Sequence, residues 1–125
     1  MEAEELVKRY QSGERDFILL SLRRSDFCGA DLNQANLSGS DLREANLSNA
    51  NLAGARLRRA DLGQANFEGA DLAGSDLGAA DLRGANLRRA NLSHANLENA
   101  SVTAEQLAQA AVLAGAILPD GSVHE

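Results

Sequence analysis

The chain has few of the residues that build disulfide frameworks, metal sites or aromatic cores. Its 125 residues include one cysteine, one proline and no tryptophan, and aromatic residues make up only 3%. A single cysteine excludes an internal disulfide and provides no metal-site spacing. The chain has no apolar run long enough for a transmembrane helix and no charged-then-apolar leader. We therefore expect a single-domain cytoplasmic protein that carries no cofactor.

Residues 17–100 contain a repeat of five residues. From residue 30 onward it reads ADLNQ, ANLSG, SDLRE, ANLSN, ANLAG and continues in this manner. Each unit has a large apolar residue at its centre, Asp or Asn one position before it (position −1), and Ala or Ser two before it (position −2). The centres run in steps of five from Phe17 to Leu97, which makes 17 units.

A period of five fits neither a regular helix nor a flat strand. In a helix, successive centres would lie about 140° apart and form no buried stripe. In a strand, they would fall on opposite faces. A short extended piece followed by a turn fits the pattern if the chain coils so that every centre points inward. The backbone of each coil then pairs with the coils above and below. Glycines at position +2, such as Gly29 and Gly39, suit a turn with positive φ.

Tandem A(D/N)LXX units resemble those of the pentapeptide-repeat proteins, and the resemblance covers residues 17–100. It implies an all-β solenoid, a right-handed quadrilateral parallel β-helix with four units per coil, so that 17 units make roughly four coils. It also implies that the centre and position −2 point inward, while positions −1, +1 and +2 face outward. With an expected N-terminal cap helix and the sequence LPDG near its other end, the chain is similar to small pentapeptide-repeat proteins that are numerous in cyanobacteria.

The first 13 residues, 1–13, depart from the repeat and predict an N-terminal cap. We expect an amphipathic helix over residues 2–12, with Glu5 and Arg9 at the spacing of a helical ion pair. Its apolar side would cover the open base of the solenoid. Bulky residues of the first coil should lie beneath it, namely Ile18, Leu19 and Leu20. The apolar residues of the helix share one face: Ala3, Leu6, Val7 and Tyr10.

Residues 101–121 predict a C-terminal cap. Thr103 and Gln106 have the spacing of a capping box, which favours a helix over residues 104–111. The repeat then resumes with Leu113 and Leu118, out of register with the earlier centres. A Pro-Asp-Gly turn follows, and we expect residues 122–125 to form a loose tail.

The sequence contains no pattern typical of catalysis. Carboxylates at position −1 could form acid–base pairs or a cation track, but the repeat requires Asp or Asn in every unit, which favours turn hydrogen bonds. Cys28 has no adjacent base, while His94 and His124 lie far apart in the sequence. An interior filled by Leu and Ala leaves no room for a substrate pocket. We therefore predict a protein that is not an enzyme, with no catalytic, cofactor or metal site.

Several arginines depart from the repeat and form a possible interaction surface. Arginine suits the recognition of carboxylate or phosphate groups. A twenty-residue coil would, however, place Asp41, Asp61 and Asp81 beside some of these arginines, so a solvated face with internal ion pairs is the alternative. The surface would comprise Arg23, Arg43, Arg83, Arg56, Arg58, Arg59, Arg88 and Arg89.

Two functions remain open at this point. The first is a structural or protein-interaction module, with another protein as its partner and no binding to nucleic acid or membrane, as a monomer or an end-to-end dimer. The second is implied by the resemblance, because some long members mimic DNA and modulate type II topoisomerase (gyrase). A DNA mimic should concentrate negative charge along its rod. Residues 17–100 carry ten acidic residues and nine arginines, so most of the net charge of −6 lies at the ends. This distribution favours the first function.

Overall fold

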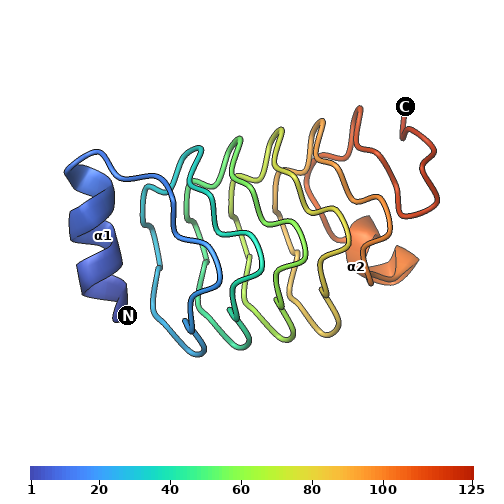
Figure 1. The fold of residues 1–125 in the computed structure, drawn as a ribbon. Coiled ribbons are helices and arrows are strands. Elements are labelled where there is room, and N and C mark those ends of the chain that lie inside the picture. Colours follow the sequence, from blue (N-terminus) through green and yellow to red (C-terminus); the bar gives the residue numbers. More distant parts are fainter.

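The computed structural model describes residues 1–125 as a rod of stacked coils with a helix at each end (Figure 1). Parallel β-bridges join residues twenty apart, from Asp16–Asn36 through to Asp81–Ser101. Twenty residues are four units, so equivalent units of successive coils lie directly above one another. We name the four resulting stacks after their first centres: the Phe17 stack (centres 17, 37, 57, 77 and 97), the Leu22 stack, the Phe27 stack and the Leu32 stack.

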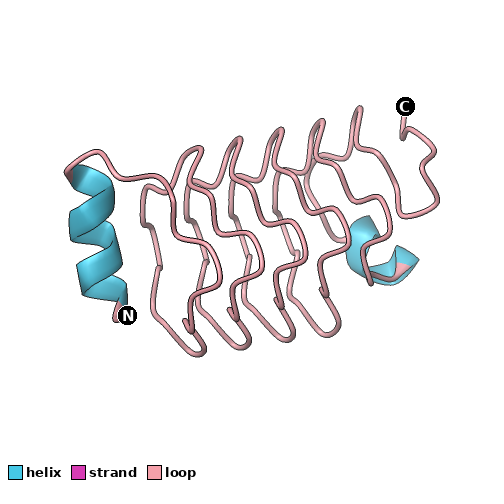
Figure 2. Cartoon of the chain, viewed as in Figure 1, coloured by secondary structure: helices cyan, strands magenta, loops and turns pink.

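The β-structure consists of isolated bridges, and the bridges do not extend into continuous strands (Figure 2). The physical reason is the turn in every unit. The residue at position +2 has a positive φ in all units from Leu19 to Asn99, whether or not it is glycine, as at Arg59 (φ 60°). A left-handed residue every fifth position ends each extended piece after about one bridge. The prediction of positive φ at the glycines of this position is confirmed and extends to the other residue types.

Backbone groups pair mainly between coils. The N–H of Leu57 donates to Asp76 O above it at 2.7 Å, and the N–H of Arg56 donates to Ala35 O below it at 2.9 Å. Within the unit, the side chain at position −1 accepts a hydrogen bond from the backbone N–H two residues on, as Asn46 does from Ser48 at 3.1 Å. This bond recurs in every unit between Asp26 and Asn96 except the one that carries Arg56. The structural interpretation of the Asp and Asn residues is therefore confirmed.

The interior is filled by the unit centres and the small residues at position −2. The centres from Phe17 to Leu97 are buried, including the phenylalanines at 27 and 67, and so are most of the alanines between them. The inward assignment is confirmed. Two serines, Ser40 and Ser75, are the only buried polar residues. Each fully buried leucine contributes about 1.5–3 kcal/mol, so the repeat itself supplies the core.

Helix α1 (Ala3–Gln11) lies across the first coil, as predicted (Figure 1). Its Leu6 and Tyr10 are buried in the same apolar cluster as the centres of that coil. The Tyr10 hydroxyl also donates to Asn33 O at 2.8 Å. The expectation that the cap covers Ile18 and Leu19 is wrong, because their exposed fractions are 42% and 76%. They occupy positions +1 and +2 and point sideways from the rod, whereas α1 closes its end.

Helix α2 (Ala104–Ala108) replaces one unit of the Phe27 stack. The predicted capping box forms between Thr103 and Gln106, but the helix ends three residues before the expected residue 111. It ends early because Ala111 N–H donates to Ala90 O at 2.8 Å, which returns the chain to the coil. Leu107 lies twenty residues after Leu87 and is buried, so it takes the place of a unit centre.

The chain after α2 completes the last coil with its register shifted by one residue. Bridges now join residues 21 apart, Asn91 with Val112 and Asn96 with Ile117, as the spacing of the last leucines predicted. The prediction of a loose tail at 122–125 is wrong. Ser122 O and His124 O accept hydrogen bonds, both at 2.7 Å, from backbone N–H groups of the last coil. Those donors have no coil above them, so the tail serves as their partner. Neither helix has the length and apolarity needed to cross a bilayer.

Candidate interaction surface

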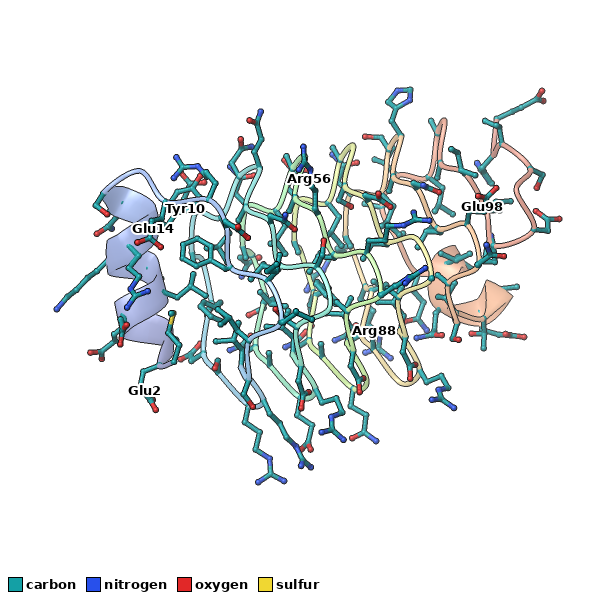
Figure 3. All side chains as sticks on the ribbon, in the orientation of Figure 1. Glu2, Tyr10, Glu14, Arg56, Arg88 and Glu98 are labelled. Atoms are coloured by element: carbon teal, nitrogen blue, oxygen red, sulfur yellow. The ribbon has the colours of Figure 1, made fainter.

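The eight predicted arginines do not form one surface. Four-unit coils distribute them over three stacks: Arg23, Arg43 and Arg83 in the Leu22 stack, three in the Phe17 stack and two in the Phe27 stack. The two labelled in Figure 3, Arg56 and Arg88, lie on different parts of the rod surface. The three groups of arginines therefore have different surroundings.

In the Leu22 stack the arginines are neutralised by neighbouring carboxylates. Arg43 lies 2.8 Å from Asp41 and 3.4 Å from Asp61. Arg83 lies 2.6 Å from Asp81. The hydrogen bond from Arg43 lowers the pKa of the Asp41 carboxyl to about 2, against the burial that would raise it. Arg23 lies 3.1 Å from Glu44 in the same way. The alternative of a solvated face with internal ion pairs is confirmed for this stack.

In the Phe27 stack both arginines also have partners. Arg89 pairs with Glu68 one coil below, and its hydrogen bond lowers the pKa of that carboxyl. Arg88 donates to the Gln109 side chain at 3.3 Å, just after α2. These two arginines thus help to fasten the C-terminal cap and the coil beneath it.

The Phe17 stack differs, because one unit carries three arginines and almost no compensating charge. Arg58 lies 3.5 Å from Asp76, and neither Arg56 nor Arg59 has a carboxylate within 4.0 Å. All three are exposed. Arg56 also replaces the Asp or Asn whose side chain would accept the N–H of Arg58, so that backbone group has no protein partner. The unit keeps its positive charge available to solvent or to a ligand.

Beside these arginines lies an exposed apolar pair that sequence reasoning placed under the cap. Ile18 and Leu19 belong to the same stack, two coils below, and they line a shallow groove with Arg58 and Arg59. Its floor is formed by Ser38 and Gly39 of the coil between them, and its volume is about 350 Å³. The sequence does indicate that Ile18 and Leu19 are exposed, because they occupy positions +1 and +2, which face outward in every unit.

The remaining candidate side chains show no grouping typical of a metal or catalytic site. Cys28 is exposed, and the nearest polar partner of its sulfur is Ser48 Oγ at 3.3 Å. No group of three His, Cys, Asp or Glu side chains is arranged to hold a metal ion. The groove is therefore the feature of this surface that combines shape, apolar contact area and uncompensated charge.

Comparison with known proteins places the repeat in a described family. The family model for pentapeptide repeats matches eight copies, over residues 21–59, 50–89 and 65–103. No curated protein sequence matches the chain. The chain is similar to the crystal structure of alr5209, a pentapeptide repeat protein from Nostoc PCC 7120, with 33% identity and a TM-score of 0.68. The match covers 89% of this chain and 95% of that one.

Two further solved structures are more distant. Rfr23, a pentapeptide repeat protein from the cyanobacterium Cyanothece 51142, is 26% identical with a TM-score of 0.50, over 98% of this chain and 100% of that one. Trypsin-treated QnrB1, a plasmid-mediated fluoroquinolone resistance protein, is 21% identical with a TM-score of 0.42, over 67% of this chain and 56% of that one. The QnrB1 match is too weak to bear on function.

Proposed function

The chain belongs to the pentapeptide-repeat family, and we propose that it is a non-enzymatic protein-interaction module that binds a partner through the side of its rod. The observation that carries this proposal is the groove of the Phe17 stack. The exposed apolar pair offers contact area next to arginines that lack carboxylate partners, and a partner protein can use both. In the other stacks the arginines of the predicted surface are bonded to carboxylates or, for Arg88, to the Gln109 side chain.

Site-specific photocrosslinking in the source cells tests the proposal. A photoreactive amino acid at position 38 would replace Ser38 on the floor of the groove. The matched control replaces Ala53, which occupies the same position +1 of its unit in the Leu32 stack. We expect one discrete crosslinked protein from position 38 and none from position 53. The same products from both positions, or none from position 38, would contradict an interaction through this side.

The charge pattern gives little support to the alternative of a DNA-mimicking gyrase modulator. Acidic residues of the Leu22 stack are paired with arginines, and the Phe17 stack presents net positive charge. A basic DNA-binding surface would be repelled by the exposed arginines. We therefore expect no inhibition of gyrase supercoiling at micromolar protein and no protection against a quinolone. Potent inhibition that weakens as salt rises would make the alternative the leading function.

We also propose that the rod is a monomeric right-handed quadrilateral β-helix. Four units per coil and the twenty-residue register of parallel bridges support the right-handed quadrilateral β-helix that the family resemblance implies. Helix α1 at one end and residues 122–124 at the other cover the open backbone edges, which supports a monomer over an end-to-end dimer. The exposed thiol of Cys28 fits a reducing compartment such as the cytoplasm. Light scattering on the purified protein tests the oligomeric state.

A further inference from the structure

We propose that the groove of the Phe17 stack binds an extended acidic peptide segment that inserts one aliphatic side chain. This inference rests on the proposed function and specifies the chemistry of the partner. One side of the groove is apolar, formed by Ile18 and Leu19, and the other is cationic, formed by Arg58 and Arg59. A ligand that satisfies both sides must offer apolar surface and negative charge next to each other.

The dimensions of the groove suit one peptide strand. Its two sides are two coils apart, which corresponds to about 10 Å at the usual spacing of neighbouring strands. A volume of about 350 Å³ is at the lower limit for small-molecule sites and holds a single aliphatic side chain with its backbone. Gly39 has no side chain to fill the floor of the groove, and a Cβ atom there would clash with Leu19 because it would lie 2.7 Å from Leu19 Cδ2. Glycine at this position therefore lets Leu19 lie over the floor of the groove.

The charge of the groove favours carboxylates. Arg56, Arg58 and Arg59 have a single carboxylate partner among them, Asp76 at 3.5 Å. The guanidinium groups of Arg56 and Arg59 have no carboxylate partner and can form paired hydrogen bonds with the side chains of Asp or Glu. In the other stacks, arginines at the same positions are already bonded to carboxylate or amide oxygens. The cationic side of the groove is thus specific to this unit and is not a general property of the rod.

Leu19 in the groove and Arg56, in the unit that carries Arg58 and Arg59, also depart from the repeat at a local cost. Arg56 forgoes the turn hydrogen bond that Asp or Asn makes in the neighbouring units, and leaves Arg58 N–H without a protein acceptor. Leu19 places a large apolar side chain on a residue with φ of 57° and leaves 76% of it exposed. Positions that break the local rules of a fold without a structural gain are expected at functional sites.

Single-stranded nucleic acid is the other ligand with negative charge, and the groove suits it less well. Its lining contains no aromatic side chain on which a base could stack. An acidic peptide meets the same arginines and, in addition, fills the apolar side.

Fluorescence anisotropy with the full chain tests the inference. The probe is a short fluorescein-labelled peptide of Asp and Glu with two central leucines. We expect saturable binding that weakens as NaCl rises, because salt screens the exposed charges. Serines in place of the two leucines should weaken binding about tenfold, since the aliphatic contact is lost. A peptide with lysines in place of the acids should not bind.

Two variants separate binding from folding. Arg56→Asn restores the turn acceptor found in neighbouring units, and Leu19→Asn introduces a residue that already adopts this conformation at Asn49 and Asn99. Both variants should keep or raise the melting temperature. Arg56→Asn should lower the affinity for the acidic peptide about fivefold, and Leu19→Asn should lower it about tenfold. The matched control Arg88→Ser removes the same charge from the Phe27 stack and should change the affinity less than twofold.

Several results would overturn the inference. The first is an unchanged affinity for the acidic peptide in both Arg56→Asn and Leu19→Asn. The second is a loss of affinity in Arg88→Ser as large as that in Arg56→Asn. The third is tighter binding of a labelled single-stranded oligonucleotide than of the peptide. Failure of the acidic peptide to bind would also overturn it. If position 38 nevertheless crosslinks a discrete protein in cells, the proposed function stands and only the acidic chemistry of the partner is wrong. If position 38 yields no crosslink, the proposed function itself is contradicted.

Discussion

The substitution Ser75→Ala should stabilise the protein, whereas Ser40→Ala should destabilise it. Both serines occupy position −2, point into the rod and are buried. Ser40 Oγ accepts the N–H of Leu20 and donates to Phe17 O, each at 3.1 Å. It thereby bridges the first turn, where the direct backbone bond that closes the other units is missing. Ser75 Oγ has no hydrogen-bond partner.

The expected magnitudes follow from these contacts. A buried hydroxyl without a partner costs about 1–3 kcal/mol, so Ser75→Ala should raise the free energy of unfolding by about 1 kcal/mol. Alanine already occupies this position in most units, and the change creates little empty volume. Ser40→Ala removes two hydrogen bonds and leaves Leu20 N–H and Phe17 O unpaired, a loss of about 1–2 kcal/mol. For a chain of this size, 1 kcal/mol shifts the melting temperature by about 4 °C.

Thermal unfolding followed by circular dichroism, together with urea titration, measures both variants against the wild-type protein. We expect melting temperatures that move in opposite directions, with Ser75→Ala above and Ser40→Ala below the wild type. Ser75→Thr is a useful third variant, because it keeps the hydroxyl and adds a methyl group to a tightly packed interior. If Ser75→Ala is destabilised as much as Ser40→Ala, the assignment of an unpartnered hydroxyl is wrong.

Three further predictions concern the core, the cap and acid stability. Leu62→Asp buries an unpaired charge, which costs several kcal/mol against a typical total of about 5–15 kcal/mol, so we expect an insoluble or unfolded product on expression. Deletion of residues 1–13 uncovers the first coil and its unpaired N–H groups, and should cause oligomers in size-exclusion chromatography with light scattering; an unchanged monomer would refute the role of the cap. The pKa of Asp41, lowered to about 2, predicts that its pairing with Arg43 stabilises the fold above pH 4 and is lost as the pH falls towards 2. Because the pair is partly exposed to solvent, the loss should be at most about 1 kcal/mol, and Asp41→Asn should abolish this part of the pH dependence.

The repeating part of the fold could be read from the sequence because the role of each residue depends on its position within a unit. A leucine every fifth residue, preceded by Asp or Asn and by a small residue, predicts which side chains point inward and where the turns lie. These preferences are local and recur in every coil, so many copies of a weak signal add up to a firm prediction. The helix α1 and the capping box of α2 were likewise visible, because their signals lie within a few neighbouring residues.

The candidate surface was only partly visible, because it depends on side chains that come together from different coils. The sequence placed Arg43 and Arg58 in outward columns, but it did not show that one is held by carboxylates while the other has only Asp76 at 3.5 Å. It offered two equivalent serines, and only the structure distinguishes the bonded Ser40 from the unpartnered Ser75. Position within a unit is set by backbone periodicity. The pairing of side chains depends instead on rotamers and on neighbours about twenty or forty residues away, which are specified only when the coils are stacked.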